Sequence, residues 1–226
     1  MDNYLKILSC TPLFVGVDIA EIEQLLKCVM AEKKSFPKNT YIFRKGDVIT
    51  SMGLVLYGSV LLVQEDLWGR RNIIAKQNLG EIFAEPFAAS SDIAINLNIL
   101  ANEDCDILFL NINRILTTCQ SVCPYHIKVM KNLVSIMAKK VLAFNEKVTH
   151  MSRKTTREKL LSYLSAESLR QNSLEFDIPY DRQQLADFLC VERAAMSVEL
   201  SKLQKQEILQ YQKNHFKLSV EAKIEL

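Results

Sequence analysis

One stretch of the sequence repeats its apolar residues at a spacing that strongly limits the fold. From Ile127 to Met151, apolar positions follow one another in alternating steps of three and four residues. The spacing averages about 3.5 residues over more than three heptads, which predicts a long helix whose apolar seam pairs with a second helix. The seam consists of Ile127, Met130, Val134, Met137, Val141, Phe144, Val148 and Met151.

The other side chains of this segment leave two arrangements open. Lys131 and Lys139 lie off the seam, while Leu133, Ile136 and Leu142 offer a second, wider apolar face. The helix can therefore pair with a second copy through the seam and pack on its own domain through the second face. Alternatively, the seam itself packs within the chain.

The region before this helix predicts β-structure. Residues 35–111 contain short β-rich runs such as TYIF, LVLYGSVLLVQ, NIIAKQ and CDILFLNI, separated by turn residues. Many short strands at close spacing indicate a jelly roll or a barrel. Residues 3–32 instead carry short helical signals, with Asp18 as a predicted N-cap.

Length and composition indicate a globular protein. The 226 residues allow one large domain or two smaller ones, and 49% hydrophobic residues can form a real core. The six cysteines mostly stand singly among apolar residues, as buried thiols do in a reducing compartment. The N-terminus shows no signal-peptide pattern, and two glycines interrupt the longest uncharged run, residues 48–64, so we expect a cytoplasmic protein.

The segment LADFLCVERAAMSVELSKL, residues 185–203, predicts two helices joined by a short turn. Asp181 is the predicted cap of the first helix. This arrangement, with small and polar residues facing outward from the second helix, is that of a helix-turn-helix. The predicted core positions are Leu185, Ala186, Leu189, Met196, Leu200 and Leu203.

The sequence after the second helix predicts a wing. EILQYQKNHFKLSV alternates like a β-hairpin, with Lys213, Asn214 and His215 at its tip. Charge alone does not indicate a nucleic-acid partner, because the net charge is +2 and residues 151–226 carry 12 Lys and Arg against 11 Asp and Glu. A DNA-binding function therefore depends on where individual cations lie.

Taken in this order, the segments resemble the bacterial transcription regulators of the catabolite-activator and fumarate-nitrate-regulator (CRP/FNR) family. The resemblance covers nearly the whole chain and is carried by TPLFVGV, IFRKGDVI, LVLYGSVLLVQEDLWGRRNIIAKQNLGEIF, the long helix and RQQLADFLCVERAAMSVELSKL. It implies an α+β fold with an effector-sensing β-roll of the cyclic-nucleotide-binding type (a double-stranded β-helix, or jelly roll) and flanking helices over residues 1–123. A dimerisation helix over 124–152 and a winged helix-turn-helix DNA-binding domain over 153–226 follow.

The resemblance also implies partners. It implies a homodimer on a palindromic DNA operator, with half-sites about one helical turn (roughly 34 Å) apart. RNA polymerase is a further implied partner, and no membrane is involved.

By position, the resemblance implies that Arg193 reads a base edge, since arginine can hold guanine through two hydrogen bonds. Ala194 and Ser197 would face the groove, and Val198 replaces an arginine of many relatives, so a known operator sequence does not transfer to this chain. Cys190 replaces a glycine common at the turn, which is tolerable if the backbone there avoids positive φ. The remaining predicted DNA-binding residues are Asp181, Arg182, Gln183, Lys202, Lys213 and Lys217.

The predicted effector site departs from that of cyclic-nucleotide-binding relatives, which use Gly-Glu and, about ten residues later, Arg-Ser to hold ribose and cyclic phosphate. Here Ala84-Glu85 and Ile95-Asn96 occupy these positions, and residues 77–113 contain no Lys or Arg. A buried phosphate would lack a charge partner. We therefore expect a small organic effector other than cyclic AMP, with Glu85 as a lone polar contact.

Two alternatives remain at this site. Pro86, Phe87 and their neighbours can fill the space, so that nothing binds. Phe144 and Asn145 match positions from which relatives contact the ligand, although Phe144 is equally a seam residue.

No cofactor is expected. Cys10 and Cys28 are too few and too separated for an iron–sulfur cluster. CQSVCPYH either supplies metal ligands from Cys119, Cys123 and His126 or contains ordinary thiols, and a redox role for the two cysteines stays open.

We do not expect an enzyme, because the β-rich region has no histidine and no catalytic motif stands out. The alternative function is a regulatory module with the same β-roll that acts through protein partners without binding DNA.

Overall fold

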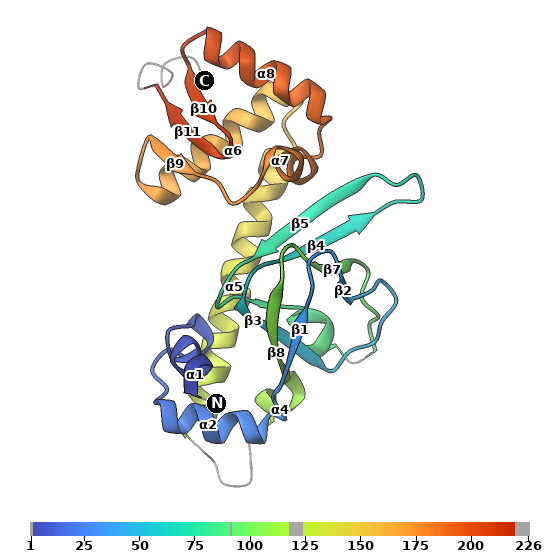
Figure 1. The fold of residues 1–226 in the computed structure, drawn as a ribbon, viewed down its shortest axis with the longest axis vertical. Helices are drawn as coiled ribbons and strands as arrows, with labels where there is room; N and C mark the ends of the chain where they lie inside the picture. Colours follow the sequence, from blue (N-terminus) through green and yellow to red (C-terminus); the bar gives the residue numbers. More distant parts are fainter. Residues whose placement is uncertain (1, 91, 118–123, 220–226) are drawn as a thin grey trace. The chain divides into compact units, whose positions relative to one another are not determined.

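The computed structural model describes residues 2–90, 92–117 and 124–219 of the chain. The chain divides into two compact units. The first comprises Met1–Arg70 and Ile74–Lys140, and the second comprises Arg71–Ile73 and Val141–Leu226. Helix α5, Pro124–Met151, contributes its first part to one unit and its last part to the other (Figure 1).

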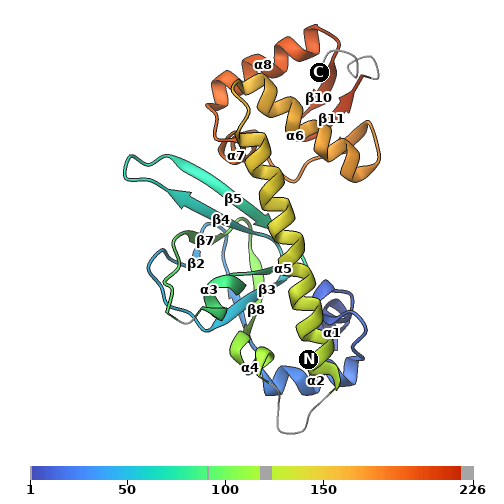
Figure 2. The ribbon, with the colours of Figure 1, turned by 180° about the vertical axis from the view of Figure 1, so that it is seen from behind.

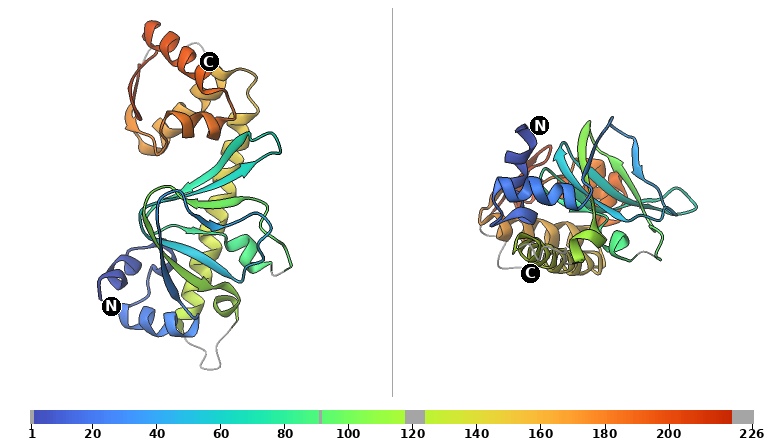
Figure 3. Two further views of the ribbon diagram at one scale, coloured as in Figure 1. Left: turned by 45° about the vertical axis from the view of Figure 1, so that its right-hand side comes forward. Right: turned by 90° about the horizontal axis from the view of Figure 1, so that it is seen from below.

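The first unit is built on two antiparallel four-stranded sheets with the orders β1-β8-β3-β6 and β2-β7-β4-β5. Strands far apart in the sequence pair within each sheet, as β3 does with β8 and β2 with β7, which is typical of a roll. Strands β4 and β5 continue as a hairpin beyond the rest of their sheet (Figure 3). The strands are β1 Glu32–Phe36, β2 Tyr41–Phe43, β3 Ser51–Tyr57, β4 Val60–Glu65, β5 Arg71–Gln77, β6 Ile82–Phe83, β7 Asn98–Ala101 and β8 Cys105–Asn111.

The core of the first unit joins the roll to the helices that flank it. Strand β3 is buried at five consecutive positions, because other elements cover both of its faces. Leu8 of α1, Ile22 of α2 and Val129 and Leu133 of α5 belong to the same apolar cluster as the strands. Figure 2 shows α1 (Asp2–Ser9) at the end of the first unit where α5 begins.

Local signals fix the ends of the shorter helices. Asp18 and Glu21 form the capping box that starts α2, Ile19–Cys28, so the predicted cap at Asp18 is confirmed. The amide of Asn132 on α5 donates to the carbonyl oxygen of Val15 at 2.9 Å, which ties the loop before α2 to α5. The remaining helices of this unit are η1 Pro12–Phe14, α3 Glu85–Ala89 and α4 Ile112–Leu116.

The second unit combines three helices with a three-stranded sheet of order β10-β11-β9. Thr155 and Glu158 form the capping box of the first helix. The elements are α6 Thr156–Gln171, β9 Glu175–Asp177, α7 Arg182–Leu189, α8 Arg193–Lys205, β10 Leu209–Gln212 and β11 His215–Leu218.

The predicted fold class is confirmed: a β-roll, a long helix and a winged helix-turn-helix follow one another along the chain. None of the described helices is long and apolar enough to cross a membrane.

Candidate nucleic-acid interface

Helices α7 and α8 form the helix-turn-helix, and its interior is apolar as predicted. The Asp181 carboxylate accepts the backbone N–H of Gln184 at 2.8 Å and caps α7. After the turn, the backbone N–H of Val191 donates back to the carbonyl oxygen of Ala186 at 3.0 Å. All six predicted core positions are buried: Leu185, Ala186, Leu189, Met196, Leu200 and Leu203.

The backbone at the turn has positive φ. Cys190 has φ +52° and ψ +53°, so the condition under which a cysteine is tolerable here, a backbone that avoids positive φ, is not met. A helix of this kind ends by reversing the sign of φ at the residue after its last turn, and that geometry is required whichever residue stands there. Cys190 therefore carries conformational strain that a glycine at this position would not have.

The outward face of α8 presents a cation at its first turn, followed by several small side chains. Arg193 is the first residue of the helix and is exposed, as are Ala194 and Val198. Ser197 is half-buried and its hydroxyl donates to the carbonyl oxygen of Arg193 at 2.9 Å. Lys202 pairs with Glu199 at 2.7 Å, so its charge is partly compensated.

The residues predicted to meet phosphates at the start of α7 already have partners within the unit. Gln183 donates to the carboxylate of Asp187 at 2.8 Å, and Asp181 serves as the helix cap. The guanidinium of Arg182 donates to the carbonyl oxygen of Lys213 at 3.2 Å and lies over the Tyr211 ring. Their roles as DNA contacts stay predictions.

The predicted wing is present as the β10–β11 hairpin. Its two-residue turn places Lys213 at φ +55°, and this lysine is exposed. Lys217 pairs with Glu175 of β9 at 3.1 Å, and His215 lies 3.1 Å from Asp177 and 3.2 Å from Glu175. The two carboxylates raise the pKa of His215 by hydrogen bonding.

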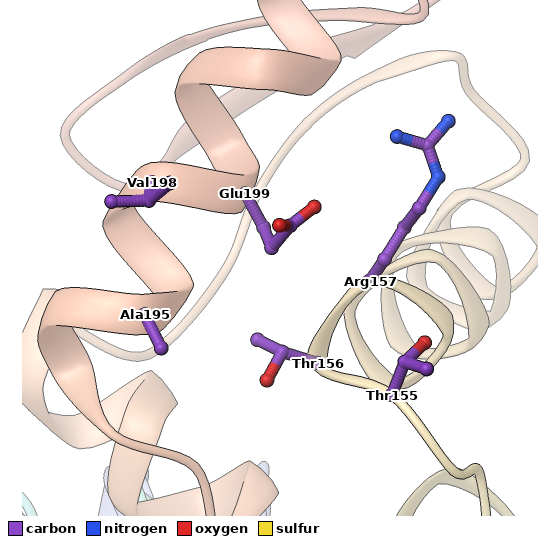
Figure 4. Close-up of a pocket in the computed structure, with 6 residues that line it drawn as sticks. All are labelled: Thr155, Thr156, Arg157, Ala195, Val198 and Glu199. Atoms are coloured by element: carbon purple, nitrogen blue, oxygen red, sulfur yellow. The ribbon is translucent and has the colours of Figure 1, made fainter.

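A pocket of about 490 Å³ lies between the start of α6 and α8. The sequence analysis did not assign this site, although TTRE there has the pattern of a helix start and follows Arg153 and Lys154. The Arg157 guanidinium donates to Gln206 at 2.8 Å and so stays beside the opening. Figure 4 shows the lining residues Thr155, Thr156, Arg157, Ala195, Val198 and Glu199.

The seam of α5 is largely exposed within one chain. Val134, Val141 and Phe144 are 64%, 60% and 54% exposed, and Met130 and Met137 pack only partly against the roll core. Described residues of the same chain cover the seam only in part, at Met130 and Met137, so packing within the chain accounts for only part of the seam.

The second apolar face of α5 is shorter than predicted. Leu133 and Ile136 pack on the roll core, but Leu142 is 64% exposed. Nine residues turn an α-helix by about two and a half turns, so Leu142 points away from the side that Leu133 occupies. Its assignment to the second face was wrong.

Glu85, the expected lone polar contact of the effector site, is buried in an ion pair. Lys140 of α5 places its Nζ 2.7 Å from Glu85 Oε1 and donates to the carbonyl oxygen of Ile82 at 2.6 Å. Glu85 is therefore not the lone polar group that was expected, because Lys140 reaches it from a helix far beyond residues 77–113. Glu85 Oε2 has no partner among the described residues.

The other predicted effector positions divide into buried and exposed groups. Ala84 and Ile95 are buried, whereas Asn96 is exposed in the first unit. Phe144 and Asn145 are exposed and belong to the second unit. Ala84 has φ +64°, the left-handed conformation for which relatives use glycine. These residues stay predictions as ligand contacts.

The proposed metal ligands fall mostly outside the described residues. Cys119 and Cys123 lie there, while His126 is buried at the start of α5 with Nδ1 unpartnered among described residues. Burial lowers the pKa of His126. Within the described ranges, no group of three or more His, Cys, Asp or Glu side chains is arranged to hold a metal ion.

Two domain families match the sequence. Residues 33–122 match the cyclic nucleotide-binding domain, and residues 158–223 match the Crp-like helix-turn-helix domain. Together these matches cover more than half of the chain. No curated protein matches the sequence closely enough to count as a relative.

Several solved structures share the fold across nearly the whole chain. The c-di-GMP-responsive global regulator CLP of Xanthomonas campestris matches with a TM-score of 0.71 and 19% identity, over 89% of this chain and 99% of that one. A CooA mutant from Carboxydothermus hydrogenoformans matches with a TM-score of 0.71 and 17% identity, over 92% of this chain and 95% of that one. FixK2 from Bradyrhizobium japonicum matches with a TM-score of 0.65 and 20% identity, over 85% of this chain and 94% of that one.

Proposed function

Because the chain belongs to the CRP/FNR family of DNA-binding transcription regulators, we propose that it is a cytoplasmic homodimer that reads a palindromic operator through α8. An effector other than cyclic AMP modulates this binding through the β-roll, and RNA polymerase is the partner that receives the signal. The observation that carries the proposal is the amphipathic α8, whose apolar face is fully buried while Arg193 stands exposed at its first turn.

The side chains around Arg193 suit a major groove. Arginine at the first turn of a recognition helix can hold guanine through two hydrogen bonds, and Val198 can contact a thymine methyl group. Lys213 on the wing adds a cation for the DNA backbone.

The exposed seam of α5 supports the homodimer. A contiguous apolar stripe of this length is costly to leave in water. A second copy of the same helix covers it by knobs-into-holes packing, and the resulting two-fold axis matches the symmetry of a palindrome.

The chemistry of the β-roll supports an effector other than cyclic AMP. A cyclic phosphate needs a cation, yet Lys140, the cation beside Glu85, is already engaged by that carboxylate. A nucleotide in the pose used by cyclic-nucleotide-binding relatives would have to break this ion pair or leave its own phosphate without a charge partner, and either costs several kcal/mol.

The proposal is tested by selecting duplexes from a random-sequence pool with the purified protein. We expect the recovered sequences to share a two-fold pattern, and the affinity to fall steeply as salt rises, because phosphate contacts release counterions. Native mass spectrometry of the same sample should report a dimer and reveal any copurified effector. If no duplex binds even at low salt, the chain acts instead through protein partners.

A further inference from the structure

Arg182 does not have the geometry of a phosphate contact. Its Nη2 donates to the carbonyl oxygen of Lys213 at 3.2 Å, and its Nη1 is closed off from solvent without a hydrogen-bond partner among the described residues. Nη1 is therefore closed to a phosphate oxygen from a DNA backbone, and Nη2 is engaged by a carbonyl oxygen of the wing.

The guanidinium instead joins helix α7 to the wing. Its Cζ lies 4.7 Å from the centre of the Tyr211 ring on β10 and 5.9 Å from that of Phe216 on β11. These two rings stack on one another at an interplanar angle of 28°, and Phe216 is fully buried. A cation over stacked rings is held more firmly than one in water, because the ring faces carry partial negative charge.

Arg182 contacts the turn of the wing. Lys213 takes positive φ there, and its carbonyl oxygen accepts the hydrogen bond from Arg182. On its other side, Asn214 donates to the carbonyl oxygen of Ile178 at 3.2 Å and accepts the backbone N–H of Ile178 at 2.9 Å. The exposed side chain of Lys213 is thus presented by a turn fixed from two directions.

Only an arginine suits this position. A planar guanidinium can lie over an aromatic ring while one of its N–H groups donates in the plane, whereas the point charge of a lysine cannot do both. The arrangement has a cost, since burial lowers the pKa of Arg182 and the nearby Arg193 charge lowers it further. Because the Arg182 guanidinium is partly desolvated and contacts the wing of its own unit, we infer that it stabilises the local structure.

We propose that Arg182 is a positioning residue that locks the wing to the helix-turn-helix, so that Lys213 meets the DNA backbone together with α8. Arg182 acts through Lys213 and makes no phosphate contact itself. This inference rests on the proposed DNA-binding function, and it replaces the role that the family resemblance implies for Arg182.

A double-mutant cycle separates the two roles. Arg182→Lys keeps the positive charge but removes the stacked guanidinium, and Lys213→Gln removes the contact that the lock presents. On a fluorescein-labelled mixed-sequence duplex of about three helical turns at low salt, we expect each single variant to bind about fivefold more weakly. The double variant should bind like Lys213→Gln alone, because Arg182 has no separate contact to lose.

Two results of the cycle would overturn the proposal. If Arg182→Lys binds like the native chain, the charge alone suffices and the stacked geometry is irrelevant. If the double variant loses affinity by the product of the two single-variant factors, Arg182 makes its own contact with DNA. Arg170→Lys on α6, whose guanidinium pairs with Glu167 and Glu146 away from the wing, is the matched control and should bind like the native chain.

A second measurement needs no DNA. Amide hydrogen exchange of the free protein should speed up at the wing turn, including the Ile178 N–H, in Arg182→Lys but not in Arg170→Lys. Unchanged exchange at the wing would refute the lock even if DNA binding is weakened. If the native chain binds no duplex at all, the proposed function fails, and the exchange data still decide whether Arg182 fixes the wing.

Discussion

Arg193 is the residue on which operator recognition depends most. It stands exposed at the first turn of α8, next to the small side chain of Ala194, so a base edge can approach its guanidinium. We expect Arg193→Ala to lower affinity for the selected operator by about 1–3 kcal/mol and to relax specificity at one base pair. Mobility-shift titrations against the operator and its point variants measure both effects.

The control for this substitution is Lys205→Ala at the other end of α8, which should leave base preference unchanged. If Arg193→Ala binds the operator and its variants like the native chain, α8 is not the recognition helix.

At Cys190 the backbone matters more than the side chain. A non-glycine residue at φ +52° is strained, and a glycine relieves that strain. We expect Cys190→Gly to raise the free energy of unfolding of the second unit by about 0.5–1 kcal/mol. Urea titrations followed by circular dichroism test this, with Cys190→Ala as the control that keeps a Cβ and hence the strain. A loss of stability in Cys190→Gly would show that contacts of the thiol outweigh the backbone term.

Single residues also show where sequence reasoning reaches its limit. The core of the helix-turn-helix was predictable because its signal is a local period: Leu185 and Leu189 lie one helical turn apart. The ion-pair partner of Glu85 was not predictable from the sequence, because Lys140 lies on a helix whose position against the roll is set by tertiary packing. The ring contacts of Arg182 were not predictable for the same reason, since Tyr211 and Phe216 come from strands that follow α8.

At the scale of elements, α5 is predictable along its seam and less so elsewhere. A heptad repeat specifies one apolar face regardless of partner, so the seam is read directly from spacing. A second face depends on what the helix packs against, and α5 leaves the roll before Leu142. The same helix therefore has a well-specified pairing face and a packing face of limited length.

We expect Val134→Glu combined with Val141→Glu to produce monomers. Both side chains are more than half exposed in one chain, so the substitutions place charges in the pairing seam without disturbing the roll core. Met137 is less suitable, because it packs partly on that core. Multi-angle light scattering measures the mass, and Lys139→Glu, which lies off the seam, serves as the control. A dimer of the double variant would exclude the seam as the interface.

The contact between α5 and α6 should respond to pH through His150. This side chain is buried, its Nδ1 lies 2.8 Å from the Ser162 hydroxyl, and its ring meets that of Tyr163 edge-on. Burial lowers the pKa of His150, the charges of Arg170 and Arg153 lower it further, and Glu146 opposes them. The folded state therefore disfavours the protonated form.

The sign follows from linkage. Below an unfolded pKa of about 6.5, the unfolded chain binds a proton that folded His150 resists, so stability falls as pH drops toward the lowered folded pKa. We expect the unfolding free energy of the second unit to decrease less between about pH 7.5 and 5.5 in His150→Gln than in the native chain. Urea titrations at both pH values measure the difference, which isolates His150 because His126 and His215 titrate in both proteins. Equal pH dependence would contradict this assignment.

At the scale of the whole molecule, two segments belong to both units: α5 and strand β5. Residues Arg71–Ile73 of β5 fall in the second unit, where Lys147 of α5 donates to the carbonyl oxygen of Ile73 at 2.5 Å and lies over the Phe188 ring of α7. Burial lowers the pKa of Lys147 to about 8. Helix α5 is thus a covalent connection between the two units, and a hydrogen bond from its Lys147 holds the residues of β5 that fall in the second unit.

Cyclic AMP should leave this system unchanged. At the site that would take its phosphate, Lys140 is already paired with Glu85, and Ile95 is buried where an arginine would be needed. A ligand that binds only the folded chain at free concentration c raises the free energy of unfolding by RT ln(1 + c/Kd), about 2.7 kcal/mol at one hundred times its Kd, and therefore raises the thermal midpoint. We therefore expect saturating cyclic AMP to shift neither the thermal midpoint of the protein nor its affinity for the selected operator. The same titration on Lys140→Met tests the reason, since removing the internal cation should destabilise the roll without creating a nucleotide site. A midpoint that rises with cyclic AMP in the native chain would show that the Glu85–Lys140 pair opens to admit the phosphate, and that this ion pair is the trigger rather than the barrier.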